Sequence, residues 1–235
     1  MLDKNFWKNY FEVYDVLNLS ISYQELLDEI LKEIDIKNGD LVLDAGGGTG
    51  NLSILLKNKG ANVINLDFCQ EALDIYKKKD PNAIIVLSDL TQRLPFSDNY
   101  FNKIVSNNAI YNIDREKRME IIKEFKRVLK PGGKIVISNL KKGFSPLKIY
   151  IDTVRKSLKK LGVLNTIKLL TNMFIPTIKM FYYNFFIQRE YKLKADNFFD
   201  FNEQKDLLEK AGFTNISETK LVYAGQGIVN SGQKL

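Results

Sequence analysis

Histidine is missing from this sequence, and cysteine occurs once, as Cys69, among 235 residues. Because histidine is the usual general base near neutral pH and a common metal ligand, its absence excludes imidazole from any chemistry or metal site. A single cysteine excludes an internal disulfide. The opening stretch MLDKNFWKNYFEVYDV carries charges where a secretion signal needs an apolar run, so we expect a cytoplasmic protein without a bound metal.

Acidic residues are scarce in one segment of the chain. Between Lys141 and Lys194 there are 12 Lys or Arg residues and 2 Asp or Glu residues, a local charge of +10. The whole chain carries +7, so the remainder carries −3. The basic character therefore belongs to this segment, and a partner of negative charge would meet the protein there.

Apolar runs rich in β-branched residues alternate with helical patterns through the first part of the chain. Five runs are typical of buried strands: 41–45, 63–67, 83–87, 103–107 and 134–140. Helical spacing separates several of them, over 52–60, 70–79 and 114–130. This alternation predicts a parallel sheet with helices on both faces and right-handed crossovers.

The tail of the chain adds a helix and two more strand-like runs. Residues 202–213 have helical spacing, and the runs 215–223 and 227–235 are joined by a short AGQ turn, which favours an antiparallel hairpin at the sheet edge. The predicted fold class is α/β: a Rossmann-like, doubly wound, mostly parallel seven-stranded sheet with a C-terminal antiparallel hairpin.

Two helical segments lie outside this alternation. Residues 144–199 fit no strand pattern and follow the fifth predicted strand. We interpret the chain as one domain, 1–235, with a helical N-terminal lead-in (1–38) and a helical lid or substrate-recognition insertion (144–199). The lead-in places aromatic residues on one helical stripe: Phe6, Trp7, Tyr10, Phe11 and Tyr14.

Four glycines fall within the nine residues LDAGGGTGN, 43–51. They follow the first predicted strand, at the point where a doubly wound sheet binds its ligand, and they allow a sharp turn and a close approach to bare main chain. The dinucleotide fingerprint would need a third glycine at position 51, where Asn51 stands. An NAD-dependent oxidoreductase is therefore the least favoured interpretation.

The pattern that is present is D-x-G-x-G-x-G, with an acid at the end of the first strand. Together with acids after the second and third strands and the stretches LPFSDNYFNKIVSN and EFKRVLKPGGKIVIS, it resembles the class I S-adenosylmethionine-dependent methyltransferases, of the small-molecule kind related to ubiquinone and menaquinone biosynthesis enzymes. The resemblance is closest over 38–140 and looser after 200.

This resemblance implies S-adenosyl-L-methionine as cofactor and assigns roles to particular residues. Asp44 and the loop 46–50 would hold its methionine end, Asp67 its ribose, Phe68 one face of the adenine, and Asp89 with the Leu90 N–H the adenine edge. Asn107 would lie beside the sulfonium. The implied cofactor site consists of Asp44, Ala45, Gly46, Gly48, Gly50, Asp67, Phe68, Asp89, Leu90 and Asn107.

The chemistry needs little from side chains, because methyl transfer from a positive sulfur is an in-line displacement that depends mainly on placing donor and acceptor. An acceptor that is already ionised needs no base. An acceptor that keeps its proton would need one, and without histidine the candidates are Tyr14, Tyr111 or a carboxylate. We assign no catalytic residue from the sequence.

The insertion supports several interpretations. Leu147, Ile151, Val154, Leu158 and Leu161 would line one side of a helix, with basic residues around the rest. The later apolar pieces are interrupted by lysines and fall short of the ~20 residues of a membrane span. The segment could be a lid whose apolar face covers the cofactor cleft, a lid that receives an acidic or amphipathic substrate, a helix resting on an anionic membrane surface through 144–190, or a homodimer contact.

The function expected from these observations is methyl transfer to a small molecule that is acidic and aromatic or amphipathic. One alternative is a nucleic-acid methyltransferase, supported by the basic segment but not by the stretch SNNAIYNI, which lacks the N-P-P-Y pattern of enzymes that methylate base amino groups. We do not expect nucleic acid as the partner. The other alternative is a protein that binds S-adenosylmethionine without catalysis.

Overall fold

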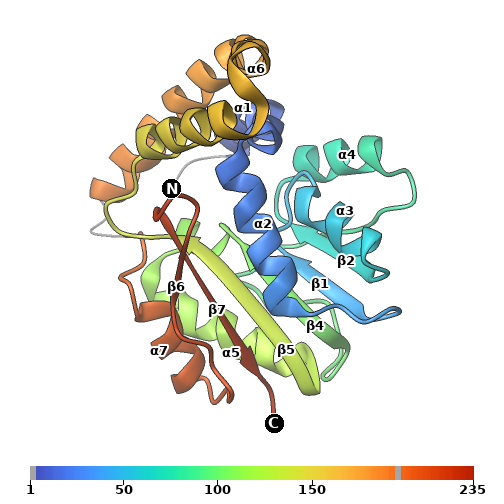
Figure 1. Ribbon diagram of the computed structural model, residues 1–235. Coiled ribbons are helices and arrows are strands. Elements are labelled where there is room, and N and C mark those ends of the chain that lie inside the picture. Colours follow the sequence, from blue (N-terminus) through green and yellow to red (C-terminus); the bar gives the residue numbers. More distant parts are fainter. Residues whose placement is uncertain (1–3, 194–196) are drawn as a thin grey trace.

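The computed structural model describes residues 4–193 and 197–235 (Figure 1). The predicted lead-in and insertion include residues 1–3 and 194–196, which lie outside the described residues. The strands are β1 (Leu41–Ala45), β2 (Asn62–Asp67), β3 (Ile84–Leu87), β4 (Phe101–Asn107), β5 (Leu129–Leu140), β6 (Lys220–Val222) and β7 (Gly227–Gln233). The helices are α1 (Lys4–Tyr14), η1 (Asp15–Leu19), α2 (Ile21–Ile34), α3 (Asn51–Asn58), α4 (Gln70–Lys79), η2 (Ile110–Asn112), η3 (Arg115–Lys117), α5 (Arg118–Val128), α6 (Pro146–Leu193) and α7 (Glu203–Lys210).

The seven strands form one sheet in the order β3-β2-β1-β4-β5-β7-β6. The pairs from β3 to β5 are parallel, while β7 is antiparallel to both β5 and β6. The predicted fold class is confirmed. In register, Asp44 of β1 lies beside Asn65 of β2 and Val105 of β4, so the carboxyl ends of these strands meet at one edge of the sheet.

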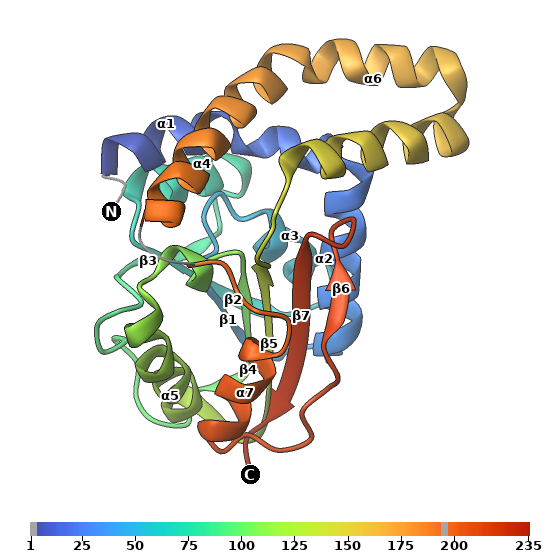
Figure 2. The same cartoon turned by 90° about the vertical axis from the view of Figure 1, so that its left-hand side faces the viewer.

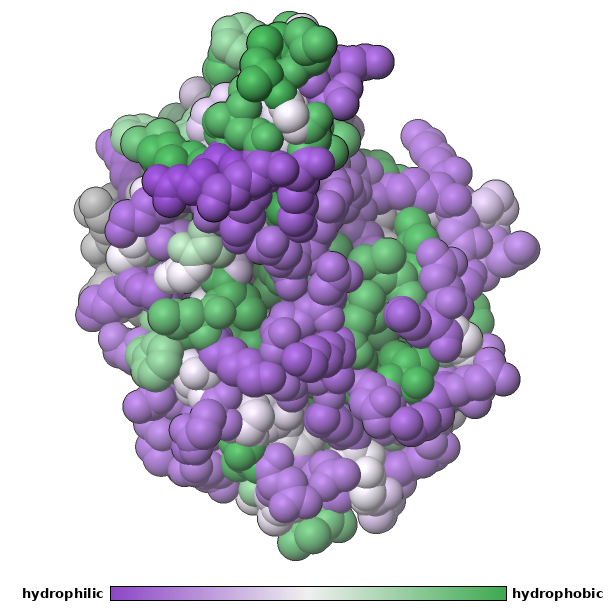
Figure 3. Space-filling model, viewed as in Figure 1, coloured by the Kyte–Doolittle hydropathy of each residue, from purple (hydrophilic) through white to green (hydrophobic). Residues whose placement is uncertain are grey.

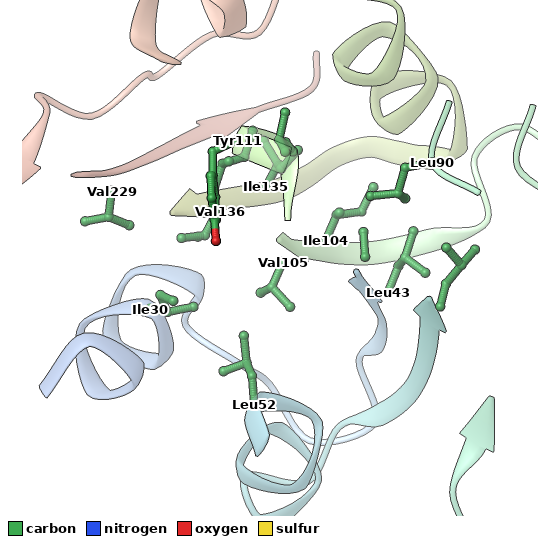
Figure 4. Close-up of a cluster of buried hydrophobic side chains, with 14 of the residues drawn as sticks. Ile30, Leu43, Leu52, Leu90, Ile104, Val105, Tyr111, Ile135, Val136 and Val229 are labelled. Carbon is green, nitrogen blue, oxygen red and sulfur yellow. The ribbon is translucent and has the colours of Figure 1, made fainter. Parts of the chain in front are cut away.

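Helices cover both faces of the sheet, with α2 and α3 on one side and α5 and α7 on the other (Figure 1). Figure 4 shows Ile30 of α2 and Leu52 of α3 facing the central strands from one side. Val42, Leu43 and Ala45 of β1 have no exposed surface, as expected for a strand covered on both faces. This buried centre fixes the edge at which the glycine-rich loop emerges.

The antiparallel edge differs in detail from the sequence prediction. The run 215–223 was expected to be a strand, but β6 covers only Lys220–Val222. Asn215, Tyr223 and Ala224 have positive φ angles of 47°, 55° and 55°, which extended strand conformation does not allow. The strand is therefore confined to the residues between these turns.

The insertion is almost entirely one helical element, α6, broken at Gly162, whose φ of 74° and ψ of 175° are non-helical. We call residues 146–161 arm 1 and residues 163–193 arm 2. Figure 2 shows the two arms as a hairpin beyond the carboxyl edge of the sheet. Only glycine adopts this backbone conformation readily, so the reversal of direction is set by one residue.

Arm 1 faces the body with its polar side. Thr153 and Ser157 are buried, and the Thr153 hydroxyl lies 2.7 Å from that of Ser20, which precedes α2. Ser22 of α2 donates a 2.8 Å hydrogen bond to Asp152. The stripe of Leu147, Ile151, Leu158 and Leu161 is exposed to solvent. The expectation that this stripe covers the cleft is therefore wrong, because the hydroxyls of α2 need polar partners.

Candidate functional site

A cavity of about 290 Å³ lies at the carboxyl edge of the sheet, where β1, β2 and β4 end. The helix α1 and the segment Asp15–Leu19 close it on one side, and the inner faces of both arms of α6 close it on another. Polar groups from the strand ends share the lining with aromatic rings from α1 and α6. This mixture of apolar wall and a few placed polar groups is typical of a small-molecule site.

The glycine-rich loop is shaped first by its protein neighbours. A Cβ atom on Gly46 would overlap the Cβ of Ala109, and one on Gly50 would overlap the ring of Tyr76. A Cβ atom on Gly48 would lie 3.0 Å from the ring of Phe11. The loop also donates a 2.7 Å hydrogen bond from the Gly46 N–H to the Leu66 carbonyl. The glycines thus bring β1, β2 and α1 together around the cavity as well as leaving main chain open to a ligand.

Asp67, at the end of β2, is 4% exposed and holds the loop from below. Its Oδ2 atom accepts a 2.9 Å hydrogen bond from the Gly48 N–H, and its Oδ1 atom accepts one of 2.9 Å from the Cys69 N–H. Burial raises the pKa of this carboxyl to about 6. Each oxygen retains a lone pair, so the carboxylate can still accept hydrogen bonds from a ligand hydroxyl.

Asp44, at the end of β1, is 1% exposed and accepts a 2.6 Å hydrogen bond from the Ser53 hydroxyl. Burial, helped by the nearby charge of Asp67, raises the pKa of this carboxyl to about 7. Two buried carboxylates that share one region repel each other. A ligand with positive charge at this end of the cavity would relieve that repulsion.

The other predicted residues are divided between the cavity and the structure behind it. Phe68 is 39% exposed and meets Trp7 edge to face, with ring centroids 6.3 Å apart. Asp89 is exposed, and its Oδ1 accepts a 2.8 Å hydrogen bond from the Thr91 N–H. Of the ten residues predicted to hold a cofactor, two do not line the cavity, Ala45 and Gly50; those that do are Asp44, Gly46, Gly48, Asp67, Phe68, Asp89, Leu90 and Asn107.

Two asparagines at the carboxyl end of β4 have oxygens available for a ligand. Asn107 and Asn108 both line the cavity. Their Oδ1 atoms are buried and have no hydrogen-bond partner within the part of the chain that the structure describes. A buried acceptor left unpaired costs free energy, about 1–3 kcal/mol. Asn107 was predicted from the sequence, whereas Asn108 and Gly47, which also lines the cavity, were not.

A cluster of tyrosines forms a further wall, and from the sequence only Tyr14 and Tyr111 of this cluster were singled out. The Tyr14 and Tyr23 hydroxyls lie 3.5 Å apart, and the Tyr23 ring lies 5.9 Å from that of Tyr223. Burial raises the pKa of Tyr14 well above 10 and that of Tyr23 to about 12, and it also raises the pKa of Tyr223 and of Tyr111. These phenols stay protonated at neutral pH and can donate hydrogen bonds. Tyr14 and Tyr111, two candidate bases, therefore cannot serve as bases in this state.

The N-terminal segment is tied to the glycine-rich loop by polar contacts. Thr49 donates a 2.7 Å hydrogen bond to Asp15, and Asn18 donates one of 2.9 Å to Asn51. Lys79 of α4 forms a 2.8 Å ion pair with Asp15. These contacts hold α1 over the cavity, where Phe11 faces Gly48.

The polar and aromatic groups that line the cavity suit a ligand with a positive charge, hydroxyl groups and a flat ring. Buried carboxylates beside a bare loop suit a ligand with a positive charge and hydroxyl groups, and Phe68 offers a face to a flat ring. Groups of three or more histidine, cysteine or acidic side chains that could hold a metal ion are absent from residues 4–193 and 197–235.

Comparisons with known proteins relate this chain to methyltransferases. Residues 43–137 match the family model described as "Methyltransferase domain". A demethylmenaquinone methyltransferase of Lactobacillus johnsonii is 29% identical over 214 residues, which cover 88% of this chain and 80% of that protein. One of Paenarthrobacter aurescens is 31% identical over 150 residues, which cover 62% of this chain and only 58% of the relative.

Solved structures resemble the fold over its full length. A S-adenosylmethionine-dependent methyltransferase from Aquifex aeolicus matches with a TM-score of 0.61 and 17% identity, over 100% of each chain. A putative enzyme of the same kind from Methanococcus maripaludis matches with a TM-score of 0.60 and 19% identity, over 100% of this chain and 95% of the other. At these identities the likeness supports the fold alone.

Proposed function

Because the chain carries a class I S-adenosylmethionine-dependent methyltransferase domain, we propose that it transfers a methyl group to a small molecule that is acidic and aromatic or amphipathic. The domain's cofactor is S-adenosyl-L-methionine. The observation that carries the choice of acceptor is the cavity itself. It joins a polar end, made by Asp44, Asp67 and the glycine-rich loop, to an aromatic end made by tyrosines and the arms of α6.

We assign the cofactor contacts as follows. Asp67 would accept hydrogen bonds from the ribose hydroxyls, and Phe68 would stack on the adenine, whose edge would meet Asp89 and the Leu90 N–H. Asp44, Gly46 and Gly48 would hold the methionine end, while Asn107 and Asn108 would offer their oxygens to the positive sulfur. Ala45 and Gly50 act by shaping the turn.

The reaction is an in-line displacement. When bound, S-adenosyl-L-methionine would supply the methyl group: a lone pair of the acceptor would bond to the methyl carbon as the carbon–sulfur bond breaks, and the bonding electrons would return to sulfur, leaving a neutral thioether. The hydroxyls of Tyr14 and Tyr23, which are protonated and lie 3.5 Å apart, would donate hydrogen bonds to an acceptor oxygen that carries negative charge. The acceptor therefore reacts as a phenolate or enolate that enters ionised, and aligning it with the methyl group supplies most of the rate increase.

The relatives support the class of acceptor. They are named as methyltransferases of demethylmenaquinone, a quinone-type molecule. For this chain we propose an acceptor of similar character, with a flat ring that fits among the tyrosines. We propose two partners for the protein: this acceptor molecule and, through residues 144–190, an anionic membrane surface. We place the protein in the cytoplasm, and a homodimer through the same segment is the alternative use of that surface.

The experiment that tests the proposal is calorimetric titration with S-adenosylmethionine and S-adenosylhomocysteine, with NADH as control. Wild-type protein should bind both sulfur compounds, and Asp67→Ala should lose that binding while Asp74→Ala, an exposed acid on α4, keeps it. Labelled cofactor then reports turnover in a screen of phenolic and quinol acceptors. Binding of NADH alone would refute the proposed cofactor site.

Turnover of tRNA or duplex DNA in the same assay, with binding that fades steeply as salt rises, would favour the nucleic-acid alternative. Cofactor binding without turnover of either class would favour a non-catalytic binding protein.

A further inference from the structure

Large apolar side chains that face solvent are concentrated on α6, which carries 12 of the 20 such residues among those described. On arm 2 they recur at helical spacing along one face: Leu164, Ile167, Phe174, Ile178, Tyr182 and Phe185. Figure 3 shows this apolar surface over α6, at the top of the view. An exposed apolar patch of this length marks a contact surface for something less polar than water.

Arm 1 carries apolar side chains on its outer side, in addition to the buried Ile149 on its inner side. Its inner side is held by hydroxyls, with Thr153 against Ser20, and Ser157 buried. Its outer side carries Leu147, Ile151 and two further leucines. A helix whose outer side met only water would carry polar side chains there.

The charge of the same surface indicates what covers it. Residues 153–189 contain 7 Lys or Arg residues and no acidic residue. Lys156 and Lys160 pair with Glu25 of α2. Within the described part of the chain, five other cations of α6 form no ion pair: Lys148, Arg155, Lys159, Lys168 and Lys179. An isologous dimer through this face would bring these cations against one another, whereas an anionic surface would neutralise them.

The geometry favours contact along a membrane surface. Arm 1 has 16 residues before Gly162 and is therefore ~24 Å long, shorter than the ~30 Å hydrocarbon core. Contrary to the expectation from the sequence, one stretch, Pro146–Ile187, is long and apolar enough to span a membrane by length and composition. It includes the reversal at Gly162, and both arms are fixed to the body along their inner faces.

We propose that the outward faces of both arms of α6 dock the protein on an anionic phospholipid surface, with the arms parallel to it. The apolar side chains enter the boundary between headgroups and acyl chains, and the lysines meet the phosphates.

Docking would also orient the cavity. Ile149 and Tyr150 of arm 1 and Met180 and Phe181 of arm 2 line it from the inner faces of the same helices. The Tyr150 and Phe181 rings, 6.3 Å apart, join the two arms over it. An amphipathic acceptor dissolved in the bilayer would reach the cavity between the arms without crossing water. This step rests on the proposed function, whereas the docking does not.

Flotation with vesicles of phosphatidylcholine, with and without phosphatidylglycerol, tests the docking. Wild-type protein should float with the anionic vesicles and lose that binding as salt rises. Ile167→Glu/Ile178→Glu should lower the bound fraction about 10-fold or more. The matched control is Ile84→Glu/Leu87→Glu on β3, which should keep vesicle binding. Ile84 and Leu87 are each 55% exposed, close to the 57% of Ile167 and the 55% of Ile178.

Failure of the wild type to float at low salt would overturn the proposal, as would equal losses in both double variants. Concentration-dependent dimerisation that only the arm 2 variant abolishes, without vesicle binding, would assign the face to a second copy instead. Cofactor titration of each variant shows that the body is folded. Flotation needs neither cofactor nor turnover. If the wild-type protein bound no cofactor but still floated, the proposed function would be refuted and the docking would stand.

A second measurement reads the orientation. In a Trp7→Phe background, a tryptophan placed on arm 2 by Phe174→Trp should report docking. Its fluorescence emission should shift to shorter wavelength with anionic vesicles and should be quenched by brominated acyl chains. Phe201 lies near the start of α7 and is 47% exposed. The fluorescence of Phe201→Trp in the same background should neither shift nor be quenched. Quenching of both, or of the second alone, would contradict docking through α6.

Discussion

At the scale of single residues, the two buried carboxylates link the cofactor site to stability. Burial places the pKa of Asp44 at about 7, above its ordinary 3.8. Between those values the native protein keeps a proton that the unfolded chain has released. Without cofactor, the free energy of unfolding should therefore fall as pH rises from about 4 to 7. Because the chain has no histidine, few other groups titrate near the upper end of this window.

We predict that Asp44→Asn flattens this dependence and stabilises the cofactor-free protein at pH 8, while it weakens binding of S-adenosylmethionine. Urea unfolding at pH 5, 6, 7 and 8 measures the first effect. Calorimetry of the wild type should show the opposite trend, with binding tightening as pH rises through the pKa values of about 6 and 7 for Asp67 and Asp44. A wild-type stability that rises across this range would contradict the assignment.

Two glycines provide a matched comparison. Gly46 and Gly132 both have a φ of 75°, but a Cβ atom on Gly46 would overlap that of Ala109, while Gly132 has open space. Gly132→Ala should lower the free energy of unfolding by about 1–2 kcal/mol, because alanine is strained in the left-handed conformation. It should leave cofactor binding intact. Gly46→Ala should lose cofactor affinity about 10-fold or more, because the loop must move. Calorimetry and thermal unfolding separate the two, and equal affinities would show that the space around Gly46 is unimportant.

The tyrosine cluster gives a third prediction. Tyr14→Phe and Tyr23→Phe should lower kcat about 10-fold or more with little change in cofactor affinity, because each removes a hydrogen-bond donor to the acceptor oxygen. Tyr182→Phe, on the outer face of arm 2, is the control for kcat. The measurement is turnover of the first acceptor found by the labelled-cofactor screen. A loss of cofactor affinity of the same size would instead make these residues part of the cofactor site.

The candidate site was predictable where a local pattern records it. The acids at the ends of β1 and β2 and the glycine-rich loop stand at recognisable positions along the chain. Eight of the ten predicted residues line the cavity. Tyr23 and Tyr223 could not be predicted, because they come from α2 and from the turn after β6, and only tertiary packing brings their rings together.

At the scale of elements, the first five strands were predictable because each contains a short apolar run rich in β-branched residues. The orientation of α6 was not. Periodicity shows that arm 1 has an apolar stripe, but the hydroxyls of Ser20 and Ser22, more than 100 residues away, decide which side turns inward. A pattern within one helix contains no information about its partner.

The reversal at Gly162 should depend on that residue alone. Gly162→Ala places a side chain at a φ of 74° and ψ of 175°, which costs about 1–3 kcal/mol. We expect faster amide hydrogen exchange throughout 146–187 with little change in β1 to β5. Gly39→Ala, at a positive φ of 85° in open space far along the chain, is the control. Unchanged exchange in α6 would mean that the hairpin is fixed by its contacts with the body.

At the scale of the whole molecule, α1 and α6 close over the cavity together. Phe6 and Tyr10 of α1 meet Tyr183 of arm 2, with ring centroids 5.4 and 6.0 Å apart. A ligand must displace part of this cover to enter, so cofactor binding and the position of α1 should be coupled.

Trp7, the only tryptophan, reports this coupling because it contacts Phe68. We predict that S-adenosylmethionine changes the Trp7 fluorescence, and that the amides of α1 exchange more slowly once it is bound. Asp67→Ala should abolish both changes at the same cofactor concentration. Constant fluorescence in a sample that calorimetry shows to be saturated would place the adenine away from Phe68.

The strand order also constrains how the protein is made. β6 touches the sheet only through β7, which follows it in the chain and pairs with β5 on its other side. While the chain emerges from the ribosome, β6 therefore has no strand to pair with, and the edge of β5 stays open until β7 is free to insert. This interval exposes an unpaired strand edge on a partly folded chain, the kind of surface that chaperones bind and that otherwise aggregates.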